Sequence, residues 1–321
     1  MGPETRPLVS VITPFLDAER FLREAVDSVF AQTYDRWELL LVDDGSSDAS
    51  TDIARAYAGT RADRVRYLEH PRHEHRGLSA SRNLGLAEAR GEVVAFLDSD
   101  DVYLPPKLER QVAMLAANPG AGMIYGRTLH WYSWSGRPED TRRDTPRHQG
   151  LELRRIIEPP HLLARLLLGE VTTPCTCGVL IRREAVERAG RFEESFRGLF
   201  EDQVYFYKLC ATTAVYADDG CWDRYRQHPR SLARMLQASG TWDGTNNPTA
   251  ARRPFLLWLG AFIDERQIAD PRLREAYRRQ MLAYTQPWRY RLSRLVDRAR
   301  EAGRAARPVR RGGAARPMGR A

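Results

Sequence analysis

The sequence contains no hydrophobic run long enough to cross a membrane. In this chain of 321 residues the longest clearly apolar stretch covers residues 255–263, whereas a bilayer-spanning helix needs roughly 20 residues. The opening MGPETRPLVS lacks the basic and apolar regions of a secretory signal, and Arg6 stands where a myristoylation signal needs serine or threonine. We therefore expect a cytoplasmic protein.

Cysteine is scarce, and its spacing is uninformative. The chain has 4 cysteines, none of them in a Cys-x-x-Cys pair. A Cys-x-Cys at Cys175 and Cys177, with Cys210 and Cys221 further along, is typical neither of a zinc site nor of a disulfide framework. We predict buried thiols, as in other cytoplasmic proteins.

Glycine-rich phosphate-binding loops are also missing. The sequence has no G-x-G-x-x-G after its first predicted strand and no G-x-x-x-x-G-K. These absences exclude the dinucleotide-binding and P-loop classes. A nucleotide bound here would have to be held by a metal ion, side chains and isolated backbone groups.

Positive charge is confined to one end of the chain. The net charge is +8, yet residues 289–321 contain 11 arginines against only Asp297 and Glu301. The rest of the chain is therefore close to neutral, and we do not expect a nucleic-acid partner. A composition of 42% hydrophobic and 29% charged residues is sufficient for a folded core and excludes an intrinsically disordered chain.

The first third of the sequence alternates between strand and helix patterns. Short β-branched or apolar runs predict strands, and apolar residues at helical spacing predict helices between them. We expect strands at residues 8–13, 38–42, 65–68 and 93–97, the first ended by Pro14, and helices at residues 21–30, 50–57, 79–89 and from Pro105 onward. This alternation predicts an α/β fold with a mainly parallel central sheet flanked by helices.

Later segments are less regular and suggest further parts. We expect a polar loop at residues 137–149, a strand at 177–181, a helix at 200–210, and helices from residue 252 with breaks near Pro271 and Pro287. The predicted organisation is a catalytic domain at residues 1–240, a helical C-terminal extension at 252–302, and a disordered basic tail at 303–321.

Two predicted strands end in acidic clusters, ELLLV-DDGSSD and VVAFL-DSDD. Ligands of open α/β sheets bind beyond the carboxyl ends of the strands, so both clusters should meet in one crevice. Gathered carboxylates favour a hard divalent cation, Mn²⁺ or Mg²⁺. Asp43 and Asp48 could equally be turn or cap residues, whereas Asp98, Asp100 and Asp101 are too many for capping.

The segments around these clusters carry a resemblance. VSVITPFLDAERFLREAVDSVFAQTYDRWELLLVDDGSSD resembles the opening of the family 2 glycosyltransferases, inverting enzymes with the Rossmann-like GT-A fold. GLSASRNLGLAEARGEVVAFLDSDD resembles their segment leading into the Asp-x-Asp motif, and RREAVERAGRFEESF, GLFEDQVYFYKL and YRQHPRSL continue in the family's order. The resemblance covers residues 8–232 and implies an inverting, metal-dependent transfer from a nucleotide-diphosphate sugar, with uridine as the preferred base, to a hydroxyl acceptor.

The resemblance also implies roles for individual residues. Asp202 would be the general base, with its neighbour Glu201 as the rival for that role. Asp100 and Asp101 would hold the metal, with His228 beside it. The donor would be bound by Thr13, Phe15, Asp44, Arg82, Asn83, Asp98 and Asp100. Arg82 could instead only pair with a surface acid, the acids at 201–202 could only favour a helix start, and His228 could be a structural histidine.

The acceptor side is less defined. Gln227-His228-Pro229-Arg230 is followed by serine, so the Gln-x-x-Arg-Trp motif of processive synthases is absent; we expect transfer of one or a few sugars to a carbohydrate or lipid-linked acceptor, as in surface polysaccharide or glycoconjugate biosynthesis. The aromatic residues of 130–134 could contact a sugar ring or pack in a strand. Trp288, Leu292, Leu295, Val296 and Ala299 form one face of a basic helix, which could lie on the inner face of a membrane or pack on the body.

Two other functions compete with this prediction. A sugar nucleotidylyltransferase would share the α/β layout, but it needs a glycine- and arginine-rich loop that ITPFLDAER lacks. A non-catalytic protein that binds membrane or nucleic acid through the basic tail would leave the acidic clusters unexplained.

Overall fold

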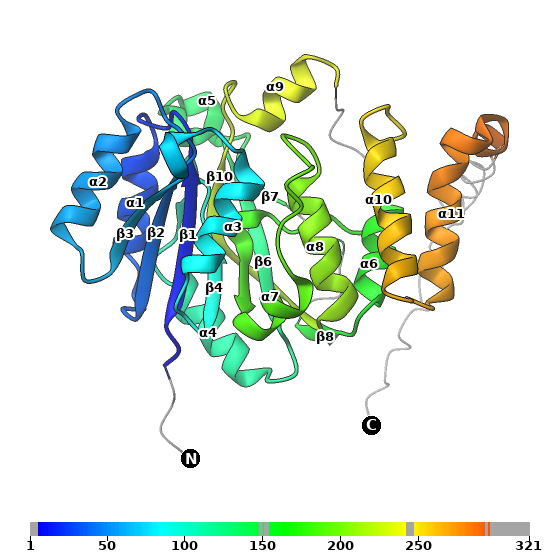
Figure 1. Cartoon of the computed structure of the whole chain (residues 1–321), viewed down its shortest axis with the longest axis horizontal. Coiled ribbons are helices and arrows are strands. Elements are labelled where there is room, and N and C mark those ends of the chain that lie inside the picture. The colour runs from blue at the N-terminus through cyan, green and yellow to red at the C-terminus, as the bar shows by residue number, and fades with distance from the viewer. Residues whose placement is uncertain (1–5, 148–149, 151–153, 242–246, 293–294, 296–321) are drawn as a thin grey trace, which may run out of the picture.

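A computed structural model of the protein describes residues 6–147, 150, 154–241, 247–292 and 295 (Figure 1). Within these residues ten strands form one sheet in the order β3-β2-β1-β4-β9-β6-β10-β5, with β7 beside β6 and β8 beside β10. The strands are β1 Val9–Phe15, β2 Trp37–Asp43, β3 Val65–Glu69, β4 Val93–Phe96, β5 Val102–Tyr103, β6 Met123–Trp131, β7 Thr145–Pro146, β8 Arg155–Ile157, β9 Val179–Arg182 and β10 Val215–Arg226.

The amino-terminal half of the sheet is parallel, as predicted. β1 pairs in parallel with β2 and β4, and β2 pairs in parallel with β3. β9 then runs antiparallel between β4 and β6, and β10 returns to a parallel pairing with β6. The prediction that Pro14 ends the first strand was wrong, because Pro14 pairs with Val42 and the strand continues to Phe15.

Alternation along the central strands builds two cores, one on each face of the sheet. Ile12, Leu40 and Phe96 belong to one buried cluster. The apolar residues next to them in the sequence, such as Val11 beside Ile12, belong to the cluster on the opposite face of the sheet. Successive side chains of a strand point to opposite faces, so a strand that is apolar at every position is covered on both sides. This explains why these runs are continuously hydrophobic.

Helices cover both faces of the sheet (Figure 1). α1 Leu22–Phe30, α2 Ser50–Thr60 and α4 Lys107–Ala117 bury their apolar residues in the cluster that contains Val11. The opposite cluster includes residues of α6 His161–Leu168, α7 Arg183–Ala189 and α8 Glu201–Thr212, and α3 Leu78–Glu88 packs against it. The predicted α/β class is confirmed.

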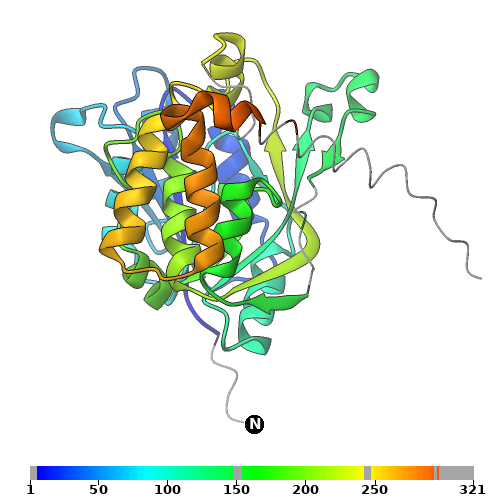
Figure 2. The same cartoon turned by 90° about the vertical axis from the view of Figure 1, so that its right-hand side faces the viewer.

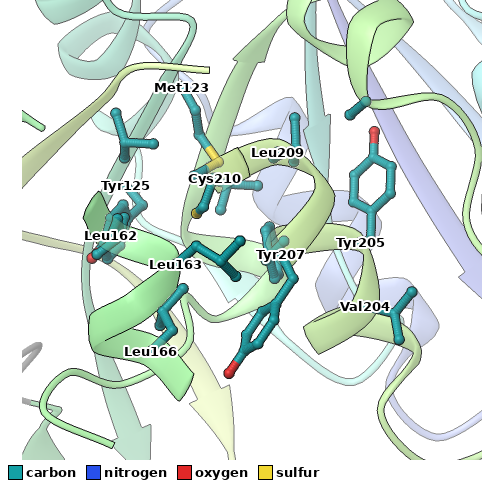
Figure 3. Packing of buried hydrophobic residues seen from close by; sticks show 14 of the residues in the cluster. Met123, Tyr125, Leu162, Leu163, Leu166, Val204, Tyr205, Tyr207, Leu209 and Cys210 are labelled. Carbon is teal, nitrogen blue, oxygen red and sulfur yellow. The ribbon is translucent and has the colours of Figure 1, made fainter. Parts of the chain in front are cut away.

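The C-terminal helices extend the second of these layers. α10 Arg252–Glu265 and α11 Pro271–Thr285 lie beside α6 and α8 (Figure 2), and Phe255 of α10 belongs to the same buried cluster as α8. Figure 3 shows the interior that they cover, where Leu163 and Leu166 of α6 meet Tyr207 of α8. The predicted helices from residue 252 are confirmed, with Pro271 opening a helix. The tail at 303–321 lies outside the described residues.

Several elements differ from the prediction. Residues 137–149 were expected to be a loop, but they include the one-turn helix α5 Pro138–Thr141 and the short strand β7. The sequence pattern also missed β10 and α9 Leu232–Ala238, whose residues mix polar and apolar types. In the part of the chain that the structure describes, every helix is too short or too polar to span a membrane.

Candidate active site

A pocket of about 600 Å³ opens beyond the carboxyl ends of β1, β2 and β4. Both acidic clusters of the sequence reach it, as the strand order requires. The lining includes Phe15, Asp44, Arg82, Asp98, Asp100, Thr176, Glu201 and Asp202, and α9 contributes Leu232, Met235 and Leu236. Five acidic side chains and one buried arginine therefore share one cavity.

Arg82 is the electrostatic centre of the pocket. Its side chain is only 2% exposed, and Nη2 donates to Oδ1 of Asp98 at 2.7 Å. Nε and Nη1 of Arg82 are buried without a protein partner. A buried charge is costly unless it is paired and hydrogen-bonded, so the ion pair with Asp98 offsets part of the cost of burying Arg82. The alternative that Arg82 pairs with a surface acid does not fit its burial.

The two acids at the start of α8 are perturbed by burial. Glu201 is 6% exposed and its Oε2 has no hydrogen-bond partner, while Asp202 also lines the pocket. Burial, reinforced by the charge of Asp202, raises the pKa of Glu201 to about 7. Burial likewise raises the pKa of Asp202, against the opposing effect of the Arg82 guanidinium. Raised carboxyl pKa values in a cleft are typical of acid–base groups.

The backbone before these acids is strained. Phe200, the residue preceding α8, has a left-handed φ of 66°, which is uncommon for a bulky residue. Its ring stacks on Phe255 of α10 with centroids 5.1 Å apart. Packing against the C-terminal layer thus holds the conformation that turns Glu201 and Asp202 into the pocket, consistent with strain stored at a functional site.

Asp100 is paired with His228, which lies 128 residues further along the chain. Nε2 of His228 lies 2.9 Å from Oδ2 of Asp100, and the two side chains are 9% and 25% exposed. An imidazole nitrogen beside a carboxylate is a donor set that Mn²⁺ accepts. The structure thus brings together two of the three predicted metal ligands, although His228 is not among the residues that line the pocket.

Arg226 holds this pair in place. Its Nε donates to the carbonyl oxygen of Asp100 at 2.7 Å, and Nη2 donates to Glu24 at 2.6 Å. The guanidinium lies over the rings of Phe21, Trp131 and Trp134 at 4.6, 4.5 and 5.4 Å. Sequence reasoning missed Arg226, although its position two residues before His228 was a signal.

The aromatic segment 130–134 therefore has a packing role. Trp134 also meets Phe21 edge-on at 5.6 Å, and its Nε1 donates to the carbonyl of Gln227. Trp131 and Trp134 are not among the residues that line the pocket. Of the two predicted roles, the structure supports packing, here around a cation.

Asp101 points away from the pocket. It is fully buried, its Oδ1 accepts the backbone N–H of Arg226 at 2.9 Å, and it is not among the lining residues. Asp101 was predicted to be a metal ligand beside Asp100. Its position favours a role behind Asp100, because Asp101 bonds to the backbone of Arg226, whose side chain in turn bonds to the Asp100 carbonyl.

The first acidic cluster divides into a pocket residue and turn residues. Asp44 lines the pocket, but its carboxylate already accepts the backbone N–H groups of Arg76 and Gly77 and contacts Nδ1 of His75 at 2.9 Å. Asp43 accepts from Ser46 and Thr51, and Asp48 accepts the N–H of Ser50 at the start of α2. Of the roles considered for Asp43 and Asp48, the structure has the turn role, since Ala49 is the N-cap residue of α2 and no side chain caps that helix.

Three predicted donor-binding residues differ in their placement. Phe15 lines the pocket, whereas Thr13 is buried in β1 one residue before Pro14 and lies outside the lining. Asn83 exchanges hydrogen bonds with the backbone N–H and carbonyl of Phe192, whose ring packs 5.4 Å from the Arg82 guanidinium. Asn83 can therefore influence the pocket through Arg82.

Comparison with known proteins agrees with this architecture. Residues 10–190 match the model of glycosyl transferase family 2. TuaG of Bacillus subtilis, a protein named for teichuronic acid biosynthesis, is 39% identical over 125 residues, which is 39% of this chain and 48% of that protein. The chain spans about half the length of such curated relatives.

Solved structures share the fold at low sequence identity. TarS 1–349 of S. aureus, in complex with UDP-GlcNAc, matches with a TM-score of 0.61 and 17% identity over 86% of this chain and 73% of that one. The mannosyltransferase PcManGT of Pyrobaculum calidifontis, in complex with GDP-Man and Mn²⁺, matches with a TM-score of 0.52 and 20% identity over 92% and 81%. The chain belongs to glycosyl transferase family 2 and has the GT-A type of α/β fold.

Proposed function

We propose that the protein is an inverting, metal-dependent glycosyltransferase that moves a sugar from a nucleotide-diphosphate donor to a hydroxyl acceptor. One observation carries the proposal: Asp98 and Asp100 of the strand-end cluster line the same pocket as Glu201 and Asp202. A glycosyltransferase needs its diphosphate-binding site and its general base close enough together to act on one bound donor and acceptor. Arg82, between Asp98 and the α8 acids, links the two halves.

Asp202 is the general base in this proposal. Burial raises its pKa, which makes the carboxylate a stronger base for the acceptor's hydroxyl proton. Asp202 accepts the acceptor's proton as the hydroxyl oxygen bonds to the anomeric carbon and the nucleoside diphosphate leaves on the opposite face. Attack from that face inverts the anomeric centre. Glu201, a buried neighbour with a pKa of about 7, is partly protonated at neutral pH, which limits the charge repulsion between the two acids.

The residues present fit a hard divalent cation. Asp100 offers a partly exposed carboxylate with an imidazole nitrogen 2.9 Å away, and Arg226 fixes the backbone behind it. Asp100 and His228 would hold Mn²⁺ or Mg²⁺, which would neutralise charge developing on the departing diphosphate. Arg82, a lining residue, supplies a second, permanent positive charge at the wall of the same pocket.

A UDP-sugar is the proposed donor. TarS is a relative in fold whose structure contains UDP-GlcNAc, whereas the PcManGT structure contains GDP-Man and Mn²⁺. Calorimetry with UDP and with GDP, each with and without Mn²⁺, tests the proposal directly. Tight UDP binding that chelation abolishes is expected. Absence of metal-dependent binding of either nucleotide by folded protein would contradict it.

The acceptor side of the pocket is amphipathic. Leu16, Leu232 and Met235 line it and are 41%, 45% and 55% exposed, close to the lining arginines Arg197 and Arg230. This mixture suits a carbohydrate acceptor that carries an apolar or anionic carrier, such as a lipid-linked sugar. We assign the protein to surface polysaccharide or glycoconjugate synthesis, a role that the name of TuaG supports.

A membrane contact at the C-terminal end would suit a lipid-linked acceptor. Trp288, Leu292 and Leu295 are 61%, 55% and 60% exposed, and Arg289 lies over the Trp288 ring. Exposed apolar side chains among arginines are typical of a helix lying on an anionic surface. We propose peripheral contact with the inner, cytoplasmic face of the membrane through these residues. Val296 and Ala299, predicted for the same stripe, lie outside the described residues.

A further inference from the structure

A second group of metal-ligating side chains lies behind the pocket wall. Cys175 and Cys177 flank Thr176 in the turn that leads into β9, and their Sγ atoms are 3.2 Å apart. A carboxylate oxygen of Asp101 completes the group, and the three ligand atoms all lie within 4.8 Å of one another. Sulfur ligands select a different class of cation from the oxygen and nitrogen pair at Asp100 and His228.

Asp101 has an unused ligand atom at this place. The side chain is fully buried, and while Oδ1 accepts from Arg226, Oδ2 has no hydrogen-bond partner in the structure. A buried carboxylate oxygen without a partner carries a substantial desolvation cost. A cation bonded to Oδ2 would remove that cost. The pocket cannot supply it, since Asp101 is not among the pocket-lining residues.

The surroundings provide an ordered outer shell. While the thiol keeps its proton, Cys177 Sγ donates to Oδ1 of Asp223 at 3.4 Å, a hydrogen bond that ends when metal binding releases this proton. Gln111 donates to the carbonyl of Gly178 next to Cys177 and would hold the turn in both states. Lys107, fully buried, donates to Gln111 at 2.7 Å and brings one positive charge near the acidic and thiol groups. Outer-shell partners of this kind orient ligands and tune affinity.

We propose that Cys175, Cys177 and Asp101 bind a thiophilic divalent cation of the Zn²⁺ class. Binding would replace the two thiol protons, released to solvent, by two metal–sulfur bonds, with no change of oxidation state. Tetrahedral Zn–S bonds of about 2.3 Å imply an Sγ–Sγ separation of about 3.8 Å, so the two thiols need to separate only slightly. Cys175 is partly exposed, which leaves a side open for water as the fourth ligand.

The site would fix one wall of the pocket. Thr176, between the two cysteines, is a lining residue, so a bound cation would join the 175–177 turn to the strand end that carries Asp100. This inference does not depend on the proposed transfer reaction. Asp101 would then bind a metal, but a thiophilic one beside the cysteines and not the Mn²⁺ or Mg²⁺ predicted beside Asp100.

The test uses the full chain, reduced and stripped of metal by chelation, titrated with Cd²⁺ or Co²⁺. We expect one equivalent to produce a thiolate-to-metal charge-transfer band that excess Zn²⁺ removes. Cys175→Ser and Cys177→Ser should each lose most of the band, and Asp101→Asn should weaken binding about tenfold or more. Cys210→Ser, which removes a thiol elsewhere in the core, is the matched control and should keep it.

Two results would overturn the site. One is a folded, reduced wild-type protein that gives no band. The other is a Cys175→Ser/Cys177→Ser double variant that keeps the band. Near-UV circular dichroism and Mn²⁺-dependent UDP binding of the same samples show whether folding or the donor site has failed instead.

Discussion

Nε2 of His228 lies 2.9 Å from Oδ2 of Asp100, although 128 positions separate the two residues in the chain. The contact joins the loop after β4 to the segment after β10, and Arg226 and Asp101 reinforce it from behind. The loop after β4 alone offers only a carboxylate. The contact with His228 adds an imidazole nitrogen, and the proposed metal dependence rests on this mixed oxygen and nitrogen site.

Replacing either member of this pair should reduce metal-dependent donor binding. Asp100→Ala and His228→Ala each remove one proposed ligand, and we expect the Mn²⁺-dependent part of UDP affinity to fall about tenfold or more. Calorimetry with and without chelator measures it. His161→Ala, a histidine exposed on α6, is the control. Unchanged Mn²⁺ dependence in both variants would disprove the assignment.

Substitutions of the two acids at the start of α8 should distinguish their roles. Asp202→Asn removes the proposed base without changing shape, so kcat should fall by about 10²–10⁴ while the donor Kd stays nearly constant. Glu201→Gln should retain much of the transfer. Rates with saturating donor and acceptor, beside donor titrations, measure both. If the Gln variant is the inactive one, Glu201 is the base.

The raised pKa of Glu201 also predicts that the stability of the protein depends on pH. Its pKa is raised from 4.5 to about 7 in the folded protein, because burial and the Asp202 charge disfavour ionisation. The folded state therefore binds the proton more tightly than the unfolded state, and its stability falls as pH rises from 4.5 through 7.

Glu201→Gln removes this ionisation and tests the sign. The variant should have a higher Tm than the wild type at about pH 8, by an amount corresponding to at most about 3 kcal/mol. The difference should shrink as pH falls to and below 4.5, because the wild-type carboxyl then becomes protonated in the unfolded state as well as in the folded one. Thermal unfolding across this pH range measures it. A difference that grows at acid pH would contradict the raised pKa.

Loss of Arg226 should affect both stability and the metal site. Arg226→Gln removes the ion pair with Glu24, the hydrogen bond to the Asp100 carbonyl and the ring contacts. Because the guanidinium is buried but Glu24 is half exposed, we expect a loss of about 2–3 kcal/mol in the free energy of unfolding. Denaturant titration measures it, with exposed Arg23→Gln as control. Equal stability of the two variants would refute the proposed role.

The exposed apolar residues near the C-terminus should bind anionic vesicles. Trp288→Ser with Leu292→Ser should lower partitioning to vesicles rich in anionic lipid, and salt should weaken the wild-type interaction. Co-sedimentation measures both effects. Leu257→Ser, an exposed leucine on α10, is the matched control. Partitioning equal to wild type would remove the membrane contact from the proposal.

Local patterns were sufficient where one element decides the outcome. The apolar runs of β1, β2 and β4 are buried on both faces, so their hydrophobicity alone identifies them, and the acids that follow them necessarily reach the same sheet edge. The sequence pattern did not predict β10 and α9, because both mix polar and apolar residues and their polar residues contact other elements. Asn83 and Asp101 were assigned to the site by position, yet their side chains bond elsewhere.

The α/β class, the family and the meeting of two acidic clusters follow from the amino-acid sequence alone, because hydrophobic periodicity and strand-end position are properties of short segments. Folding was needed to show which acids share the pocket, that Arg82 is buried among them, and that three aromatic rings surround Arg226. It also brought Asp101 to Cys175 and Cys177. Those outcomes depend on contacts between residues far apart in the chain, and neither spacing nor composition records such contacts.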